Sequence, residues 1–274
     1  MAGFDPQIAE YYERGEEQAR LANVTRAGPL ELVRTQELIL RHLPAGRSLN
    51  VLDVGGGPGV YAEWLAGLGH EVRLIDPVAL HVEQARARDA RITAEVGDAR
   101  SLDAPDGCAD VVLMLGPLYH LVYAEDRVRA LAESRRVLRP GGLFFAAAIS
   151  RFAALFDLLI RLDRIHEPEV WATVESAVRT GLFEGHQPGL FTTAYFHLPD
   201  ELAGEVGAAG FEAVRIYNIE GPGFVVSDFP ARWEDEARRR AVLEAARLVE
   251  SEPSLMGASS HLLAVGHRPD DRPI

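Results

Sequence analysis

Hydrophobic positions follow two rhythms along most of the chain. Short, nearly continuous apolar runs predict strands buried on both faces, and the stretches between them carry apolar residues at helical spacing. The predicted strands are residues 50–54, 71–75, 92–96, 110–115, 143–149, 211–219 and 261–266. The predicted helices are residues 60–68, 78–88, 124–138 and 199–209, with a last helix on which Trp233, Ala237, Ala241 and Leu248 share a face. This alternation predicts an α/β fold whose mostly parallel sheet carries helices on both faces.

Two segments break the alternation. Residues 1–46 show partial helical periodicity that stops at Pro44 and Gly46, which predicts an N-terminal helical cap. This cap is either a surface layer or a lid from which Tyr12 and Arg20 reach a ligand. Residues 151–198 carry two helical apolar stripes and many aromatic residues, and we expect them to form a helical substrate lid outside the sheet. The core then consists of residues 47–150 and 199–268.

The composition narrows the classes of partner. A formal net charge of -13 and a pI near 5.2 argue against nucleic acid, whose binding normally rests on a basic surface, and against anionic membranes. The single cysteine, Cys108, cannot form an intramolecular disulfide. The first residues lack a signal-peptide pattern, and the longest apolar run, residues 143–149, is too short to cross a bilayer. We expect a cytoplasmic protein that binds a small molecule, no nucleic acid and no membrane, with a homodimer as one option for its assembly.

A glycine-rich turn, residues 53–59, follows the first predicted strand. Glycines let the backbone approach a bulky ligand closely, and the helix that follows offers free N–H donors. Asp53, Asp76 and Asp98 end three successive predicted strands, where ligands bind in doubly wound sheets. Asp76 lies roughly 20 residues beyond the turn, where a carboxylate meets ribose hydroxyls in nucleotide-binding folds. These acids predict a shared nucleoside site.

The spacing of the glycines argues against a dinucleotide. A dinucleotide-binding turn has the pattern Gly-x-Gly-x-x-Gly, whereas Gly55, Gly57 and Gly59 alternate with single residues here. Asp53 precedes the turn, where its charge would repel a diphosphate but suits an ammonium group. The sequence therefore favours a cationic cofactor.

Four motifs, in order, resemble those of class I S-adenosylmethionine-dependent methyltransferases: the turn Asp53 to Gly59, then Asp76, then Gly97-Asp98-Ala99, then Leu138-Arg139-Pro140-Gly141-Gly142-Leu143. The resemblance implies a Rossmann-like, doubly wound, seven-stranded sheet, S-adenosylmethionine as methyl donor and S-adenosylhomocysteine as product. It implies that Asp53 fixes the amino group, Asp76 the ribose and Asp98 the adenine. Together with the cap, the expected cofactor-binding residues are Tyr12, Arg20, Asp53, Gly55, Gly56, Gly57, Gly59, Asp76, Pro77, Gly97, Asp98, Ala99, Leu115 and Gly116.

The end of the fourth predicted strand, residues 115–120, should face the methyl group. Family members that methylate adenine or glutamine amino groups have an Asp/Asn-Pro-Pro-aromatic motif here, and this chain has Gly116 and Leu118 instead. Amide and base-amino acceptors are therefore disfavoured. Metal-dependent catechol enzymes of the family need acids near this point, but the next carboxylates are Glu125 and Asp126. We expect no metal.

Catalysis by direct displacement needs a general base only if the acceptor must lose a proton. His120 is the first candidate because a neutral imidazole can accept that proton, and Tyr119 could orient the acceptor. His120 could equally cap a helix or bond to backbone. His186 and His197 are further candidates in the insertion.

The aromatic insertion favours a small, partly apolar or aromatic metabolite as acceptor. The sequence does not separate O-, N- and C-methylation. Two alternatives remain: a protein of this fold that binds S-adenosylmethionine without transferring the methyl group, and a methyltransferase directed at protein or RNA.

Overall fold

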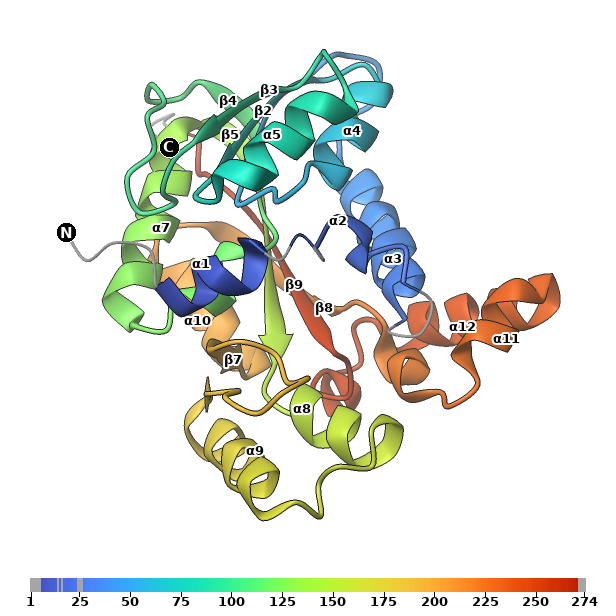
Figure 1. Ribbon diagram of the computed structural model, residues 1–274. Coiled ribbons are helices and arrows are strands. Elements are labelled where there is room, and N and C mark those ends of the chain that lie inside the picture. The colour runs from blue at the N-terminus through green and yellow to red at the C-terminus, as the bar shows by residue number, and fades with distance from the viewer. Residues whose placement is uncertain (1–5, 14, 16, 24–26, 271–274) are drawn as a thin grey trace.

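The computed structural model describes residues 6–13, 15, 17–23 and 27–270 (Figure 1). A parallel sheet in the order β3-β2-β1-β4-β5 forms its core. Beyond β5, β9 and then β8 continue it in antiparallel fashion. The strands are β1 (Asn50–Val54), β2 (Glu71–Asp76), β3 (Thr93–Val96), β4 (Ala109–Met114), β5 (Leu138–Ser150), β8 (Glu212–Asn218) and β9 (His261–His267).

Helices cover both faces of the sheet, as predicted. The reason is visible in β4, where Val111 and Leu113 pack with one set of helices, and Val112 and Met114 pack with the other. The first set is α3 (Gly28–His42), α4 (Val60–Gly67) and α5 (Ala79–Arg88). The second set is α6 (Pro117–His120), α7 (Ala124–Val137) and α10 (Pro199–Ala208). Both apolar layers hold the carboxyl ends of the parallel strands at one edge.

The last parallel strand is longer than predicted and carries an extra hairpin. β5 pairs with β9 on one side as far as Ile149, while β4 on the other side pairs only as far as Ala146. The free stretch of β5 beyond β4 pairs with β7 (Ala194–His197), which in turn pairs with β6 (Leu182–Phe183). The prediction that residues 151–198 lie wholly outside the sheet is therefore wrong, and the sheet has nine strands.

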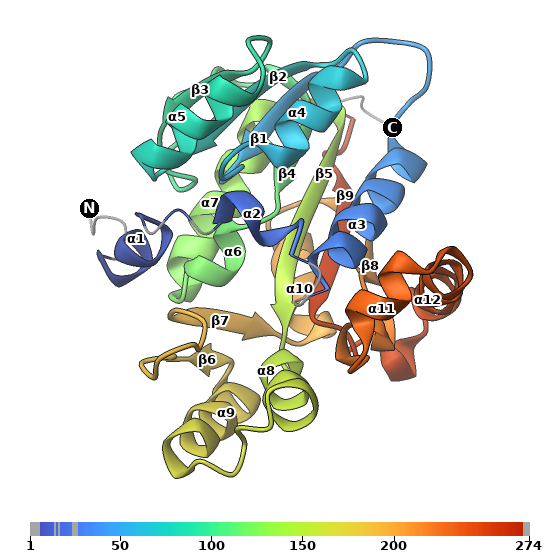
Figure 2. The ribbon, with the colours of Figure 1, turned by 45° about the vertical axis from the view of Figure 1, so that its right-hand side comes forward.

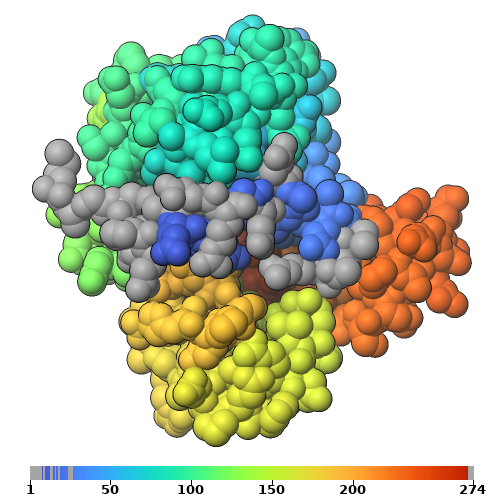
Figure 3. Space-filling model, in the orientation of Figure 1, coloured from blue at the N-terminus to red at the C-terminus, as the bar shows by residue number. Residues whose placement is uncertain are grey.

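The rest of the insertion forms a helical lobe below the core in Figure 2. It contains α8 (Ala153–Phe156), the π-helix η2 (Asp157–Arg161) and α9 (Pro168–Thr180). The N-terminal helices α1 (Pro6–Glu13) and α2 (Glu17–Arg20) lie between the core and this lobe (Figure 1). The dark-blue atoms of this segment that are visible in Figure 3 lie between the teal core and the yellow lobe.

The C-terminal part adds helices beside α3. It consists of η3 (Gly221–Val225), α11 (Phe229–Glu234), α12 (Glu236–Val249) and η4 (Pro253–Leu255). The prediction that Trp233 and Leu248 share one helical face is wrong, because Asp235 caps a new helix and Leu248 is 85% exposed. No helix in the described part of the chain is both long and apolar enough to cross a membrane.

Candidate active site

A cavity opens at the carboxyl ends of β1 to β4, which we call the glycine-turn cavity. Its wall includes Gly57, whose φ of +56° lies in the left-handed region that favours glycine. Among the described residues, a Cβ at Gly57 would have one neighbouring atom within 4 Å, the Cγ of Glu17. The backbone thus leaves room for a ligand directly above the turn.

Asp76, at the end of β2, is buried against this turn. Its Oδ2 accepts a hydrogen bond from the Gly57 N–H (2.8 Å), and its Oδ1 accepts one from the Val78 N–H (2.9 Å). His81 Nδ1 lies 3.0 Å from the same Oδ1. These bonds fix the carboxylate in the cavity wall, where it can accept further hydrogen bonds from a ligand.

Asp53 lies beneath the turn and is 1% exposed. Its Oδ2 has no hydrogen-bond partner among the described residues. Burial, helped by the nearby negative charge of Asp76, raises the pKa of Asp53 to about 7. A buried carboxylate in this state gains most from a cationic partner.

Asp98 follows β3 at the far wall of the cavity. Arg100 donates to both of its oxygens, with Nη2 to Oδ2 at 2.6 Å, and also reaches Asp126. Although burial alone would raise the pKa of Asp98, the hydrogen bonds from Arg100 lower it below its ordinary value. The residue is thus an ionised acceptor at the cavity wall.

Most of the predicted site residues come together here. Those that line the glycine-turn cavity are Tyr12, Gly55, Gly57, Asp76, Pro77, Gly97, Asp98, Ala99, Gly116, Tyr119 and His120. Those outside its lining are Arg20, Asp53, Gly56, Gly59 and Leu115. A Cβ at Gly59 would lie 2.9 Å from that of Ala85 in α5, so this glycine permits two helices to pack. A Cβ at Gly56 would meet the Asp53 carboxyl group.

A second cavity lies between the cap, the end of β5 and the insertion, and we call it the aromatic cavity. Its wall is mainly apolar and includes Phe183, Phe191 and Phe224. Tyr12 and Tyr119 line both cavities, so the two meet at these side chains. The predicted contact residue Arg20 lines the aromatic cavity and pairs with Glu31 instead of lining the glycine-turn cavity.

A hydrogen bond joins the cap to the wall of the glycine-turn cavity. The Tyr12 hydroxyl lies 2.6 Å from Nε2 of His120, and burial raises the pKa of Tyr12 above its ordinary value. Burial also lowers the pKa of His120 to about 3. The neutral phenol therefore donates to a neutral imidazole, and His120 does not line the aromatic cavity.

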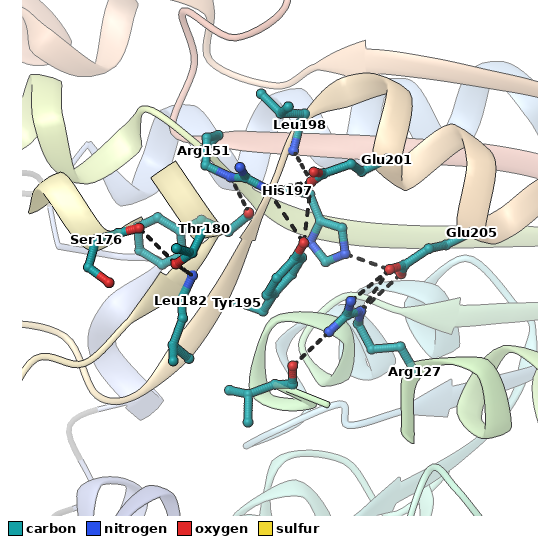
Figure 4. Close-up of polar contacts among 12 residues, drawn as sticks. Arg127, Arg151, Ser176, Thr180, Leu182, Tyr195, His197, Leu198, Glu201 and Glu205 are labelled. Atoms are coloured by element: carbon teal, nitrogen blue, oxygen red, sulfur yellow. Dashed lines mark hydrogen bonds and ion pairs between the residues drawn. The ribbon is translucent and has the colours of Figure 1, made fainter. Parts of the chain in front are cut away.

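The insertion is anchored to the core next to this pair (Figure 4). Arg127 of α7 donates to Glu205 of α10 and to the backbone carbonyls of Leu121 and Val122, which directly follow His120. Its guanidinium carbon lies 3.9 Å from the ring centre of Tyr195 in β7. His197, a candidate base in the sequence, is fully buried in this anchor with Nε2 3.3 Å from Glu205, and it lines neither cavity. His186 is exposed.

Sequence reasoning missed a charged cluster in the aromatic cavity, formed by Glu31, Glu220 and His261. Their ligand-type atoms lie within 4.8 Å of one another. His261 starts β9, which is antiparallel to β5 and pairs there with Ile149. The start of an antiparallel strand thus lies at the same edge as the carboxyl ends of the parallel strands. The pattern of residues at the carboxyl ends of the predicted strands therefore does not indicate this cluster.

A family model for a methyltransferase domain matches residues 51–142, from β1 into β5. A ubiquinone/menaquinone biosynthesis C-methyltransferase of Acidiphilium cryptum is 34% identical over 182 residues, which are 62% of this chain and 69% of that protein. The chain belongs to the class I S-adenosylmethionine-dependent methyltransferases. A ubiquinone biosynthesis O-methyltransferase of Methylocella silvestris is 29% identical over 177 residues, 57% of this methyltransferase and 68% of the relative.

Solved structures share the fold of the methyltransferase. An S-adenosylmethionine-dependent methyltransferase of Methanosarcina mazei gives a TM-score of 0.59 at 16% identity and covers 85% of this chain and 98% of its own. Phosphoethanolamine N-methyltransferase 2 of Haemonchus contortus gives a TM-score of 0.60 at 14% identity. The match covers 98% of this chain and 61% of that one. These likenesses concern the fold alone and confirm the predicted Rossmann-like architecture. The sequence comparisons confirm the predicted family and enzyme class, and this family implies S-adenosylmethionine as the cofactor.

Proposed function

We propose that the methyltransferase methylates a small, partly apolar or aromatic metabolite. One observation carries the proposal: the glycine-turn cavity and the aromatic cavity meet at Tyr12 and Tyr119. A methyl donor in the first cavity would face an acceptor in the second across this junction. A largely apolar wall with a few polar groups is typical of pockets for small molecules.

The glycine-turn cavity fits S-adenosylmethionine. The open space at Gly57 accommodates a ligand against the backbone. The unpartnered Oδ2 of Asp53 lies beneath the turn, outside the cavity lining, and would reach an amino group through water. Asp76 would accept from the ribose hydroxyls, and Asp98 from the adenine amino group. When bound, the cofactor supplies an activated methyl group for direct displacement.

The residues of the chain then have to align the acceptor, since alignment supplies much of the acceleration in such a reaction. We assign this work to Tyr12 and Tyr119 at the junction. His120 holds Tyr12 through its Nε2, and its low pKa leaves it neutral. In the closed arrangement it supports the junction instead of receiving a proton from the acceptor.

The relatives leave the methylated atom open. Those named above are a C-methyltransferase and an O-methyltransferase of ubiquinone biosynthesis, so both acceptor atoms occur among them. Their acceptor class is consistent with the apolar wall of the aromatic cavity. We propose an acceptor that combines an apolar body with a polar group.

Release of S-adenosylhomocysteine tests this proposal. A cell extract is divided into a small-molecule filtrate, a protein fraction and an RNA fraction, and each is added to enzyme and S-adenosylmethionine. We expect the filtrate to stimulate release and the other fractions not to. Stimulation by the protein or RNA fraction alone would contradict the proposal.

Removing the Tyr12–His120 hydrogen bond should slow turnover. We expect Tyr12→Phe to lower kcat/KM about tenfold, because a buried hydrogen bond contributes about 1 kcal/mol or somewhat more. His120→Ala should give a similar loss, and the double variant should lose little more, since both changes remove one interaction. Undiminished turnover of His120→Ala, measured with the active filtrate, would remove this residue from the mechanism.

Cofactor affinity should depend on pH through Asp53. Its pKa is about 7, so at lower pH the carboxyl group must lose a proton before it can pair with an amino group. We expect the affinity for S-adenosylhomocysteine to fall by up to about tenfold per pH unit below about 7 and to level off above it. Calorimetry of Asp53→Asn should show this dependence removed. An equal dependence in wild type and variant would rule out Asp53 as its source.

A further inference from the structure

Besides the Asp157–Arg161 ion pair of η2, the aromatic cavity has one cluster of charged residues, the charged end, within an otherwise mainly apolar wall. Arg20 from α2, Glu31 from α3, Glu220 after β8 and His261 at the start of β9 all line it. None of the four lines the glycine-turn cavity. The charged end therefore belongs to the acceptor side and not to the methyl donor.

Glu220 holds the His261 ring in one orientation. The carboxylate is 2% exposed, and its Oε2 accepts from the Ser259 hydroxyl (2.8 Å) and from the His261 backbone N–H (3.0 Å). Its Oε1 lies 2.5 Å from Nδ1 of the His261 ring. Because Nδ1 donates to this carboxylate, Nε2 is the ring nitrogen left for a molecule in the cavity.

The cluster is better matched to an organic group than to a metal ion. Arg20 donates to both oxygens of Glu31, at 2.6 and 3.0 Å, and Glu220 already accepts three hydrogen bonds. A divalent cation would have to displace these donors and lie beside a guanidinium group. The charges are instead paired within the protein, since Arg20 also donates to Glu17 and His261 pairs with Glu220.

The protonation state of His261 indicates what it can bind. Burial disfavours the charged imidazole, but the carboxylates of Glu31 and Glu220 outweigh this effect and raise the pKa of His261 to about 9, while Arg20 opposes them. At neutral pH both ring nitrogens carry protons, so Nε2 is a charged donor. Such a donor binds an acceptor oxygen, and it offers no lone pair to an ammonium group, which is itself a donor.

We infer that His261 binds an oxygen of the methyl acceptor, carboxylate or carbonyl, through its Nε2–H, and that Glu220 is the positioning residue that orients the ring. This inference rests on the proposed function and adds the acceptor class: an apolar body that ends in a hydrogen-bond-accepting oxygen. Because His261 does not line the glycine-turn cavity, it orients the acceptor and takes no proton from the methylated atom.

Three probes that carry the polar group on the same chain carbon, three methylenes from a phenyl ring, test the inference on enzyme loaded with S-adenosylhomocysteine: 4-phenylbutyrate, 5-phenylpentan-2-one and 4-phenylbutylamine. Calorimetry should show the carboxylate binding at least about tenfold more tightly than the amine, with the ketone between them. His261→Phe should weaken carboxylate binding about tenfold or more and leave amine binding unchanged. His261→Gln, which keeps an N–H donor on its side chain, should retain part of the affinity.

Two further variants separate a binding role from a structural one. His267→Phe makes the same change at the opposite end of β9 and should leave the affinity for all three probes unchanged. Glu220→Gln should weaken carboxylate binding, but should add no loss once His261 is replaced by Phe, because Glu220 acts through that ring.

Any of three results would overturn the inference. The loaded wild-type enzyme could fail to bind the carboxylate, it could bind carboxylate and amine with equal affinity, or His261→Phe could keep the full affinity for the carboxylate. Tight binding of Mn²⁺ alone that is lost in both His261→Phe and Glu220→Gln would show a metal site instead. Failure of the proposed function is distinguished from failure of this inference by the release assay, because the filtrate would then not stimulate S-adenosylhomocysteine release.

Discussion

Replacing Asp76 by alanine should weaken S-adenosylhomocysteine binding by at least about a hundredfold. The proposed contacts are two hydrogen bonds from ribose hydroxyls to a buried carboxylate, each contributing about 1.5–3 kcal/mol, and about 1.4 kcal/mol corresponds to a factor of ten. Calorimetry of the purified variant measures the loss. Undiminished affinity would contradict the assignment of Asp76 to the ribose.

Asp76 also accepts hydrogen bonds from the Gly57 and Val78 N–H groups, so alanine could disturb the turn itself. Asp76→Asn keeps the shape and one acceptor oxygen, and we expect it to lose about tenfold in affinity. Asp103→Ala, an exposed acid beyond β3, should bind like wild type. Thermal melting of all three variants separates lost contacts from lost structure.

Gly57→Val should abolish measurable cofactor binding. A side chain at this position would occupy the space above the turn, where the Cβ has almost no protein neighbours. It would also strain the backbone, because φ is +56° and β-branched residues avoid this region. We expect an affinity loss of at least about a hundredfold, since the ligand would have to give up its contact with the turn.

The strain alone can be measured at Gly46. This glycine has a φ of +83°, and a Cβ there would meet nothing within 4 Å. Gly46→Val should therefore lower the free energy of unfolding by about 1–2 kcal/mol, as the strain in Gly57→Val does, and should bind S-adenosylhomocysteine as tightly as wild type. Equal binding by the two variants would show that Gly57 does not face the cofactor.

Features fixed by local pattern could be predicted from the sequence. The glycine turn, Asp76 and Asp98 each follow a short apolar run, and the parallel sheet brings such strand ends to one edge. The sequence predicts that Tyr12 could belong to a lid and that Tyr119 could orient the acceptor, but it does not predict that both side chains line both cavities. Its position depends on how the cap folds over the core, which periodicity does not encode.

Features fixed by distant pairing could not be predicted. β7 joins the sheet through two residue pairs with the free end of β5, too few to leave a strand signal in the sequence. His261 and Glu220 reach the aromatic cavity because β9 is antiparallel, so that its start lies where the parallel strands end. Gly56 and Gly59 match the family motif, yet their hydrogens face Asp53 and Ala85, so packing explains them without a ligand.

The most direct test of methyl transfer to a small molecule is to follow an isotope-labelled methyl group from S-adenosylmethionine. The enzyme is incubated with the active small-molecule filtrate, and mass spectrometry locates the label while S-adenosylhomocysteine is quantified. We expect one labelled metabolite, formed in an amount equal to the S-adenosylhomocysteine and absent with Asp76→Ala. Label found only on protein or RNA, or cofactor binding without any labelled product, would contradict this expectation.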